Sequence, residues 1–328
     1  MKYINEFRDQ RIAKKLTGRL AAEAGRLGSP ARTVTLMEVC GTHTMSIYRH
    51  GIKALVPDTV RLVSGPGCPV CVTPVGYVDT AIELCRMEGA ITANFGDMIR
   101  VPGTKSSLLN ERGRGRDIRV VYSPLDAVTM AKENPKSQMI FLGVGFETTT
   151  PLIASAILTA AREGVENFSV LAAHKVMPEP MEALMSGELK IDGYICPAHV
   201  SAIIGEKGYI RLVEKYHIPC VITGFEPLDI LRGITMLVTQ IADGRAQVEN
   251  EYCRVVKPEG NVKAREILYE VFEKSDAVWR GVGLIKDSGL AIREKYGKYD
   301  AARRFGVSAP ESKENPACLC GEILKGLK

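Results

Sequence analysis

The feature that most constrains the fold of this chain is a set of eight short apolar runs, which alternate with segments of helical pattern. This alternation is typical of parallel α/β architecture, because parallel strands need a crossover connection that is usually a helix. The runs carry few charges, as expected of strands that are covered on both faces. The expected strands are Val34–Val39, Arg61–Val63, Ala90–Ala93, Ile118–Tyr122, Met139–Val144, Ser169–Ala172, Gly193–Cys196 and Cys220–Thr223.

The eight runs divide into two sets of four whose junctions are similar. The first strand of each set enters a polar turn, at 39–44 and at 144–149, and the fourth enters Pro-Leu-Asp and a helix, at 124–126 and 227–229. We therefore expect an α/β fold of two similar domains with four-stranded parallel sheets plus a smaller irregular C-terminal region. The expected boundaries are 1–33 for an N-terminal helix, 34–135 and 136–245 for the two α/β domains, and 246–328 for the C-terminal region.

Within the C-terminal region, the pattern changes after Gly244. We expect a strand at Glu251–Val256 and a helix at Val262–Phe272. From Trp279 onward, Gly, Lys and Pro dominate and the periodicity fades, which predicts irregular structure.

The composition excludes several classes of protein. The chain has 328 residues, 45% hydrophobic and 25% charged, with a formal net charge of +5, which is ordinary for a globular protein. It has no run of roughly 18 apolar residues that could cross a membrane, and its charged first residues do not resemble a secretory signal. No nucleic-acid-binding motif accompanies the basic run at Arg112–Arg119. We therefore expect a cytoplasmic protein with neither a membrane nor a nucleic acid as its partner.

The nine cysteines indicate metal or redox chemistry, because structural disulfides are uncommon in the cytosol. The sharpest local signal is Cys68-Pro-Val-Cys71, since two cysteines at this spacing can close a disulfide or bind one metal. A helix from about Pro74 would present its positive N-terminal end, which favours thiolate. Gly65 and Gly67 remove side-chain bulk, so that a partner can approach the backbone closely.

Two further cysteine motifs are candidates for chemistry. Cys40 follows the first strand in a polar turn, and His43, three residues later, could act as a ligand, base or hydrogen-bond partner. Cys318-Leu-Cys320 is a weaker metal signal by itself. In open α/β sheets ligands bind beyond the carboxyl ends of the strands, and Glu147, His174 and His199 occupy such positions after later strands. The remaining cysteines Cys85, Cys196 and Cys220 lie in expected helices or strands, so we expect them to be packing residues.

Together, the motifs resemble the HypD family of [NiFe]-hydrogenase maturation factors. The matching segments run through nearly the whole chain. They are Tyr3-Ile-Asn-Glu-Phe-Arg-Asp9, Met37-Glu-Val-Cys40-Gly-Thr-His43-Thr, Gly65-Pro-Gly-Cys68-Pro-Val-Cys71, Asn94-Phe-Gly-Asp97, Gly145-Phe-Glu-Thr-Thr149, Pro197-Ala-His-Val-Ser201, Gly224-Phe-Glu-Pro-Leu-Asp229 and Cys318-Leu-Cys-Gly-Glu322.

This resemblance implies an assembly scaffold with redox activity rather than a conventional enzyme. It implies that, with a HypC-type small chaperone, the chain holds the iron of an Fe(CN)2CO precursor. Cyanide would come from a HypE-type donor, and the finished unit would pass to the hydrogenase large subunit. It further implies that Cys40 ligates iron, that Cys68 and Cys71 form a redox-active pair that can also bind metal, and that a [4Fe–4S] cluster lies in the third region.

The cluster expectation meets one departure from the family pattern. Members of the family usually continue beyond Cys-x-Cys-Gly-Glu with several more cysteines, whereas here only Cys318 and Cys320 lie in this part of the sequence. Since a cubane cluster needs four ligands, the sequence predicts that these two thiols cannot hold it unaided.

Two other functions fit the same residues. Cys40, His43, Cys68 and Cys71 would make a Cys3His set, which is a common structural zinc site. A free-standing thiol–disulfide oxidoreductase is the other alternative. A pyridine-nucleotide enzyme is disfavoured, because the sequence lacks a nucleotide-binding glycine fingerprint.

Overall fold

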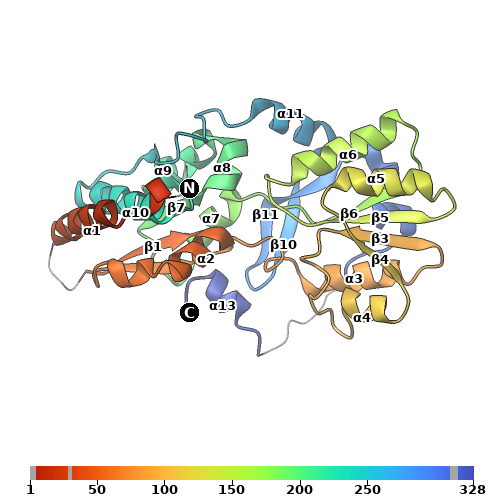
Figure 1. The fold of residues 1–328 in the computed structure, drawn as a ribbon, viewed down its shortest axis with the longest axis horizontal. Helices are drawn as coiled ribbons and strands as arrows, with labels where there is room; N and C mark the ends of the chain where they lie inside the picture. Colours follow the sequence, from red (N-terminus) through yellow and green to blue (C-terminus); the bar gives the residue numbers. More distant parts are fainter. Residues whose placement is uncertain (1–4, 29–31, 311–316) are drawn as a thin grey trace. The chain divides into compact units, whose positions relative to one another are not determined.

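The computed structural model describes residues 5–28, 32–310 and 317–328 and divides into two compact units (Figure 1). Unit 1 comprises Met1–Cys68, Pro180–Val262 and Leu319–Lys328, and unit 2 comprises Pro69–Glu179 and Lys263–Cys318. The family-like motif at 3–9 begins outside the described residues. No helix in the described ranges is both long and apolar enough to cross a membrane.

Each unit is built on a parallel sheet. In unit 1 the order is β2-β1-β7-β8-β9, and in unit 2 it is β4-β3-β5-β6. The strands of unit 1 are β1 (Val34–Glu38), β2 (Val60–Ser64), β7 (Gly193–Pro197), β8 (Cys220–Thr223) and β9 (Val248–Asn250). The strands of unit 2 are β3 (Ala90–Asn94), β4 (Asp117–Val120), β5 (Gln138–Gly143) and β6 (Phe168–Ala172).

The α/β prediction with two similar parallel sheets is confirmed, and every expected strand of these sheets is present. Counted along the chain within each unit, both sheets have the strand order 2-1-3-4, and unit 1 adds β9 at its edge. The division of the chain differs from the expected contiguous domains 34–135 and 136–245, because β1 and β2 pair with β7 and β8. Strands β3 and β4 pair instead with β5 and β6.

The similar junctions seen in the sequence form the same local structure. Both Pro-Leu-Asp segments start a helix with the proline in the first turn and the aspartate at the third position. The carboxylates of Asp126 and Asp229 accept hydrogen bonds from the backbone N–H groups of Ser123 and Glu226, which closes a capping box at each helix start.

The core of unit 1 lies between its sheet and the helices that flank it. Helices α1 and α10 lie side by side (Figure 1), and Leu20 and Ala24 of α1 join the same apolar cluster as Ile230 and Ile234 of α10. Asp9 caps α1 by accepting hydrogen bonds from the N–H groups of Arg11 and Ile12. The helices of this unit are η1 (Asn5–Arg8), α1 (Gln10–Gly25), α2 (Gly41–Arg49), η2 (Ile52–Leu55), α7 (Pro178–Leu184, whose first two residues belong to unit 2), α8 (Ala198–Ile204), η3 (Glu206–Tyr209), α9 (Ile210–Tyr216), α10 (Pro227–Ala242) and α13 (Cys320–Leu324).

The sheet of unit 2 is buried on both faces, as expected of a parallel sheet. Along its central strand β5, Met139 and Phe141 join one apolar cluster, while Ile140 and Leu142 join the cluster on the opposite face. The helices of this unit are α3 (Val75–Cys85), α4 (Leu108–Gly113), α5 (Pro124–Glu133), α6 (Thr150–Arg162), α11 (Val262–Val271), η4 (Glu294–Tyr299) and α12 (Ala301–Phe305).

The C-terminal region is more regular than its sequence predicts. The helix α11 is confirmed, but the expected strand at Glu251–Val256 is wrong, since this segment forms turns after the short strand β9. Residues beyond α11 form an antiparallel hairpin of β10 (Phe272–Trp279) and β11 (Gly283–Ile292). The sequence did not reveal this hairpin, because the glycines that suggested irregular structure belong to its turn. Gly281 and Gly283 adopt the left-handed conformation there.

Candidate functional site

The carboxyl ends of β1 and β7 mark the best position for a site in unit 1. These two strands are neighbours, and the chain leaves β1 toward β2 but leaves β7 toward β8, on the opposite side. Such a reversal of strand order opens a crevice at the sheet edge, where ligands bind in open α/β folds. Cys40 follows β1 directly, and His199 lies in α8, which follows β7.

Cys40 is held where the first strand becomes a helix. It has extended backbone angles and is the residue before the first turn of α2, and it is only 8% exposed. Burial raises the pKa of the Cys40 thiol above its usual value, while the backbone N–H groups of Thr42 and His43 act in the opposite direction. The raised pKa favours the protonated thiol, and ligation of a metal by this sulfur would require loss of the proton.

The glycine-rich loop after β2 packs against the Cys40 turn by backbone contact. The N–H of Gly41 donates to the carbonyl oxygen of Gly67 at 3.1 Å, and the N–H of Gly65 donates to the carbonyl oxygen of Glu38 at 2.8 Å. A Cβ atom added to Gly67 would lie 2.1 Å from the backbone nitrogen of Cys40, which no side chain can tolerate. The missing side chain of Gly67 therefore admits the backbone of Cys40, and the contact brings Cys68 beside Gly41. The predicted approach of a partner at these glycines stays a prediction.

His43 reaches across the sheet edge to the end of β8. Its Nε2 atom lies 3.0 Å from the carbonyl oxygens of both Thr223 and Gly224, so Nε2 carries the proton that it donates. Burial lowers the pKa of His43 to about 4, which keeps the ring neutral. The Nδ1 atom has no hydrogen-bond partner among the described residues. The geometry gives His43 a structural contact, and its predicted chemical role stays a prediction.

An aromatic stack connects the two histidines of unit 1. The ring of Phe225 lies 4.7 Å from that of His43 and 4.3 Å from that of His199, between ring centres. His199 is more exposed than the buried His43, and partial burial lowers its pKa. The loops after β1, β7 and β8 therefore meet in one cluster on unit 1, although their residues are far apart in the sequence.

The other predicted cysteines are more accessible. Cys71 and Cys318 are exposed, while Cys68 and Cys320 are partly exposed, and the division between the units falls between Cys68 and Pro69. Helix α3 begins at Val75, close to the predicted start. The expected packing role of Cys85, Cys196 and Cys220 agrees with their burial.

The described residues do not form a preassembled site for an iron–sulfur cluster or for zinc. No group of three or more His, Cys, Asp or Glu side chains in the described ranges is arranged to hold a metal ion. Cys318 and Cys320 provide only two thiols at the start of α13, so they do not fit a [4Fe–4S] cluster unaided. In the Cys3His alternative, His43 would bind the metal through Nδ1, because its Nε2–H group donates to the carbonyl oxygens of Thr223 and Gly224.

The sequence interpretation missed two buried charged residues. Glu38, the one charged residue of β1, is 2% exposed and accepts a hydrogen bond from the N–H of Cys40 at 2.9 Å. In unit 2, Lys175 is 3% exposed and lies 5.8 Å from the ring centre of Trp279, and burial lowers its pKa to about 8. The sequence signal that could have identified both residues is a charged side chain inside an apolar strand or just beyond its end, because such a residue is rarely buried without a specific role.

Comparison with known proteins places these features in a family. A family model named HypD, described as the hydrogenase formation hypA family, matches residues 11–328. The hydrogenase maturation factor HypD of Azotobacter vinelandii is 46% identical over 336 residues, covering 100% of this chain and 88% of the relative. The factor of the same name from Rhizobium leguminosarum bv. viciae is 44% identical over 337 residues, with 100% and 86% covered. A putative hydrogenase expression/formation protein of Methanocaldococcus jannaschii is 41% identical over 320 residues, with 98% and 88% covered.

We predict that Gly67→Ala displaces the Cys40 turn, because its new Cβ atom would overlap the Cys40 backbone. The variant should lose about 2 kcal/mol or more in free energy of unfolding, measured by urea denaturation followed by circular dichroism. Gly41→Ala is the matched control, since its Cβ would meet the Cβ of Cys68 at an ordinary 3.7 Å. Equal stability of the two variants would contradict the close backbone contact.

We predict that the buried carboxyl of Glu147, in unit 2, makes stability fall as pH rises. Burial raises its pKa from the usual 4.5 to about 8, so the folded chain holds a proton that the unfolded chain has lost between about pH 5 and pH 8. Glu147→Gln should remove a slope on the order of 1 kcal/mol per pH unit. Unfolding of unit 2 can be followed by the fluorescence of Trp279, the single tryptophan.

The exposed Glu88 gives the control for this measurement, because Glu88→Gln should leave the slope unchanged. His174 is also buried, and its pKa is lowered to about 3, but it is common to all three proteins and cancels in the comparison. A wild-type slope equal to that of Glu147→Gln would show that Glu147 is ionised in the folded chain.

Proposed function

Because the chain belongs to the HypD family of hydrogenase maturation factors, we propose that it is the assembly scaffold for the iron of a [NiFe]-hydrogenase. On this scaffold the iron is the cargo, and cyanide and carbon monoxide are installed as its ligands. The observation that carries the proposal is the position of Cys40, which lies at the strand-order reversal of unit 1 and whose backbone packs against the Cys68 loop.

Cys40 is the proposed iron ligand. A soft thiolate suits iron that carries strong-field ligands, and the start of α2 supplies backbone N–H groups that favour the deprotonated sulfur. The low exposure of Cys40 limits access by water, so iron bound to its sulfur would be shielded from solvent. Release of the thiol proton on binding makes iron affinity rise with pH.

Cys68 and Cys71 are the proposed redox pair. Their conversion from dithiol to disulfide releases two electrons and two protons to an acceptor such as an external disulfide, and an external dithiol reduces the pair again. Both sulfurs are accessible enough for this exchange. Cys68 lies beside the Cys40 turn, which supports a role for this pair in the chemistry at the iron. Both sulfurs are additional candidate iron ligands in their thiolate form.

The proposed partners follow from the scaffold role. Iron held by one buried thiol needs further ligands, and a HypC-type small chaperone would supply part of this set. A HypE-type protein would deliver cyanide, and the hydrogenase large subunit would receive the completed Fe(CN)2CO unit. The partners' contribution to ligation makes the chain a scaffold rather than a conventional enzyme.

We predict that Cys40→Ala abolishes iron–ligand assembly without unfolding the chain. The chain should be purified anaerobically with the small chaperone and examined by infrared spectroscopy in the cyanide and carbonyl stretching region. The bands should fall at least about 10-fold, since even the loss of outer-shell metal contacts costs that much in affinity. Cys253→Ala is the control, because Cys253 is an exposed cysteine of unit 1. Normal bands in Cys40→Ala would remove Cys40 from the iron site.

We also predict that Cys68 and Cys71 interconvert as a two-electron couple. Thiol trapping at defined redox potentials, with mass analysis of the peptide that contains both, should give a Nernst slope of about 30 mV per decade. Cys68→Ser should show no such step. If no disulfide forms at any potential, the pair serves as metal ligands only, and the proposed redox role is wrong.

A further inference from the structure

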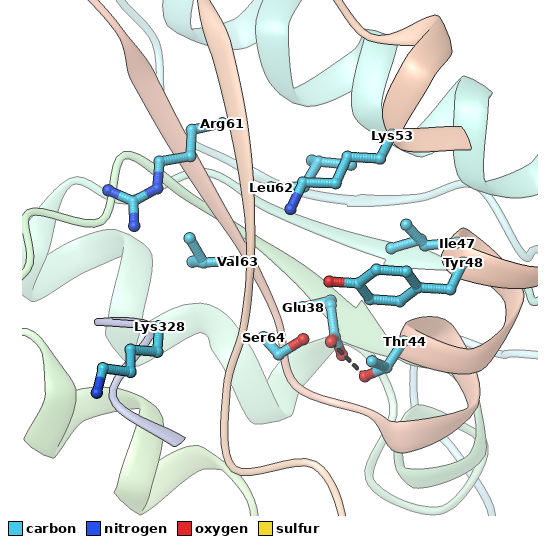
Figure 2. Close-up of a pocket in the computed structure, with 10 residues that line it drawn as sticks. All are labelled: Glu38, Thr44, Ile47, Tyr48, Lys53, Arg61, Leu62, Val63, Ser64 and Lys328. Atoms are coloured by element: carbon cyan, nitrogen blue, oxygen red, sulfur yellow. Dashed lines mark hydrogen bonds between the residues drawn. The ribbon is translucent and has the colours of Figure 1, made fainter. Parts of the chain in front are cut away.

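Glu38 is the only charged residue of β1, and it lies inside the protein. It is 2% exposed and borders a cavity of about 120 Å³ in unit 1 (Figure 2). The cavity is also lined by Thr44, Ile47, Tyr48, Lys53, Arg61, Leu62, Val63, Ser64 and Lys328. A buried carboxylate is costly unless hydrogen bonds compensate for its lost hydration.

The carboxylate of Glu38 accepts hydrogen bonds from the Cys40 turn and from α2. Its Oε2 atom accepts from the N–H of Cys40 at 2.9 Å. Its Oε1 atom accepts from the hydroxyl of Thr44 in the first turns of α2, as Figure 2 shows. Ser64, the last residue of β2, lines the same cavity, and its hydroxyl acts to lower the pKa of Glu38.

These contacts do not form an ion pair. Within the described ranges, no lysine or arginine nitrogen lies at ion-pair distance from Glu38, although Lys53 and Arg61 line the same cavity. The contacts of the carboxylate are therefore directional hydrogen bonds from donors that belong to the Cys40 turn and to its helix. The backbone carbonyl of Glu38 accepts from the N–H of Gly65, which follows β2.

We propose that Glu38 is a positioning residue, which fixes the Cys40 turn relative to α2 and to the end of β2, and so aligns Cys40 with the glycine-rich Cys68 loop. The proposal rests on the proposed iron-scaffold function for its purpose, but its geometric content concerns the free protein. In this role Glu38 does more than fill space, because its acceptor atoms, rather than its volume, hold the Cys40 turn, α2 and the end of β2 together.

Two variants of similar volume separate these roles. Glu38→Gln keeps an oxygen that can accept from the N–H of Cys40, and the hydroxyls can rotate to accept from its amide. Glu38→Met fills the same space but has no comparable acceptor, so it leaves the buried N–H of Cys40 unsatisfied. Both variants remove the charge, so any effect of that charge on the Cys40 thiol is shared and their difference reports the hydrogen bonds.

The experiment measures the rate at which iodoacetamide alkylates Cys40 in the full chain, without iron or partners. Mass spectrometry follows each cysteine peptide separately, and the exposed Cys253 serves as the internal reference. Glu38→Met should expose Cys40 and raise its alkylation rate about 10-fold above that of Glu38→Gln. The exposed Glu214 provides the matched surface control, since Glu214→Gln should leave the rate unchanged.

Equal rates in Glu38→Gln and Glu38→Met would overturn the proposal, because only volume or charge would then matter. If Glu38→Met fails to fold, as judged by circular dichroism, Thr44→Val carries the test. It keeps Glu38 but removes one donor, and it should raise the rate several-fold. An unchanged rate would equally overturn the positioning role.

The same variants distinguish this inference from the scaffold function. Iron content is measured separately after anaerobic purification with the small chaperone. If the wild-type complex holds no iron but the two Glu38 variants differ in alkylation, the positioning role stands and the scaffold function fails. If wild-type, Glu38→Gln and Glu38→Met hold iron equally while alkylation is also equal, the scaffold function stands and the positioning role fails.

Discussion

The contact between Gly67 and the backbone of Cys40 is the constraint on which the candidate site depends. A Cβ atom at Gly67 would lie 2.1 Å from the Cys40 nitrogen, so the two loops can meet only because one of them lacks a side chain. Backbone hydrogen bonds from Gly41 and Gly65 fix the same approach from both sides. The consequence is that one sheet edge presents a buried thiol and a more accessible thiol, on loops that leave adjacent strands.

The topology of unit 1 explains why this contact occurs at a site. Parallel pairing of β1 with both β2 and β7 places the ends of these strands together, and the strand order reverses between β1 and β7, which is the position where ligands bind in open α/β folds. His43 then closes the edge toward β8 as a neutral ring that donates to backbone oxygens. Unit 2 repeats the strand order, but β3, which corresponds to β1, is followed by Phe95-Gly-Asp97 and by no thiol, while the buried Glu147 and His174 follow β5 and β6. The same fold therefore supports different polar chemistry in its two copies.

Much of this organisation could be predicted from the sequence, because strands buried on both faces leave continuous apolar runs and the turns after them keep their polar residues. The runs around Val34 and Gly193, and the thiol of Cys40, were identified in this way. Pairing between them could not be predicted, since parallel strands covered on both faces carry no mark of their neighbours, and contiguity in the chain suggested the wrong partners. The burial of Glu38 was equally hidden, because the hydrogen-bond donors to its carboxylate come from a turn and a helix that form only after the strand ends.

The central claim is that Cys40 supplies a sulfur ligand to iron that awaits its cyanide and carbonyl ligands. Iron X-ray absorption spectroscopy of the anaerobic complex with the small chaperone tests it most directly, because the spectrum counts sulfur neighbours of the metal. The account predicts a stoichiometric iron whose sulfur shell loses one scatterer in Cys40→Ser, in which an oxygen replaces the sulfur. A sulfur shell unchanged by this substitution, or stoichiometric zinc in place of iron, would contradict it.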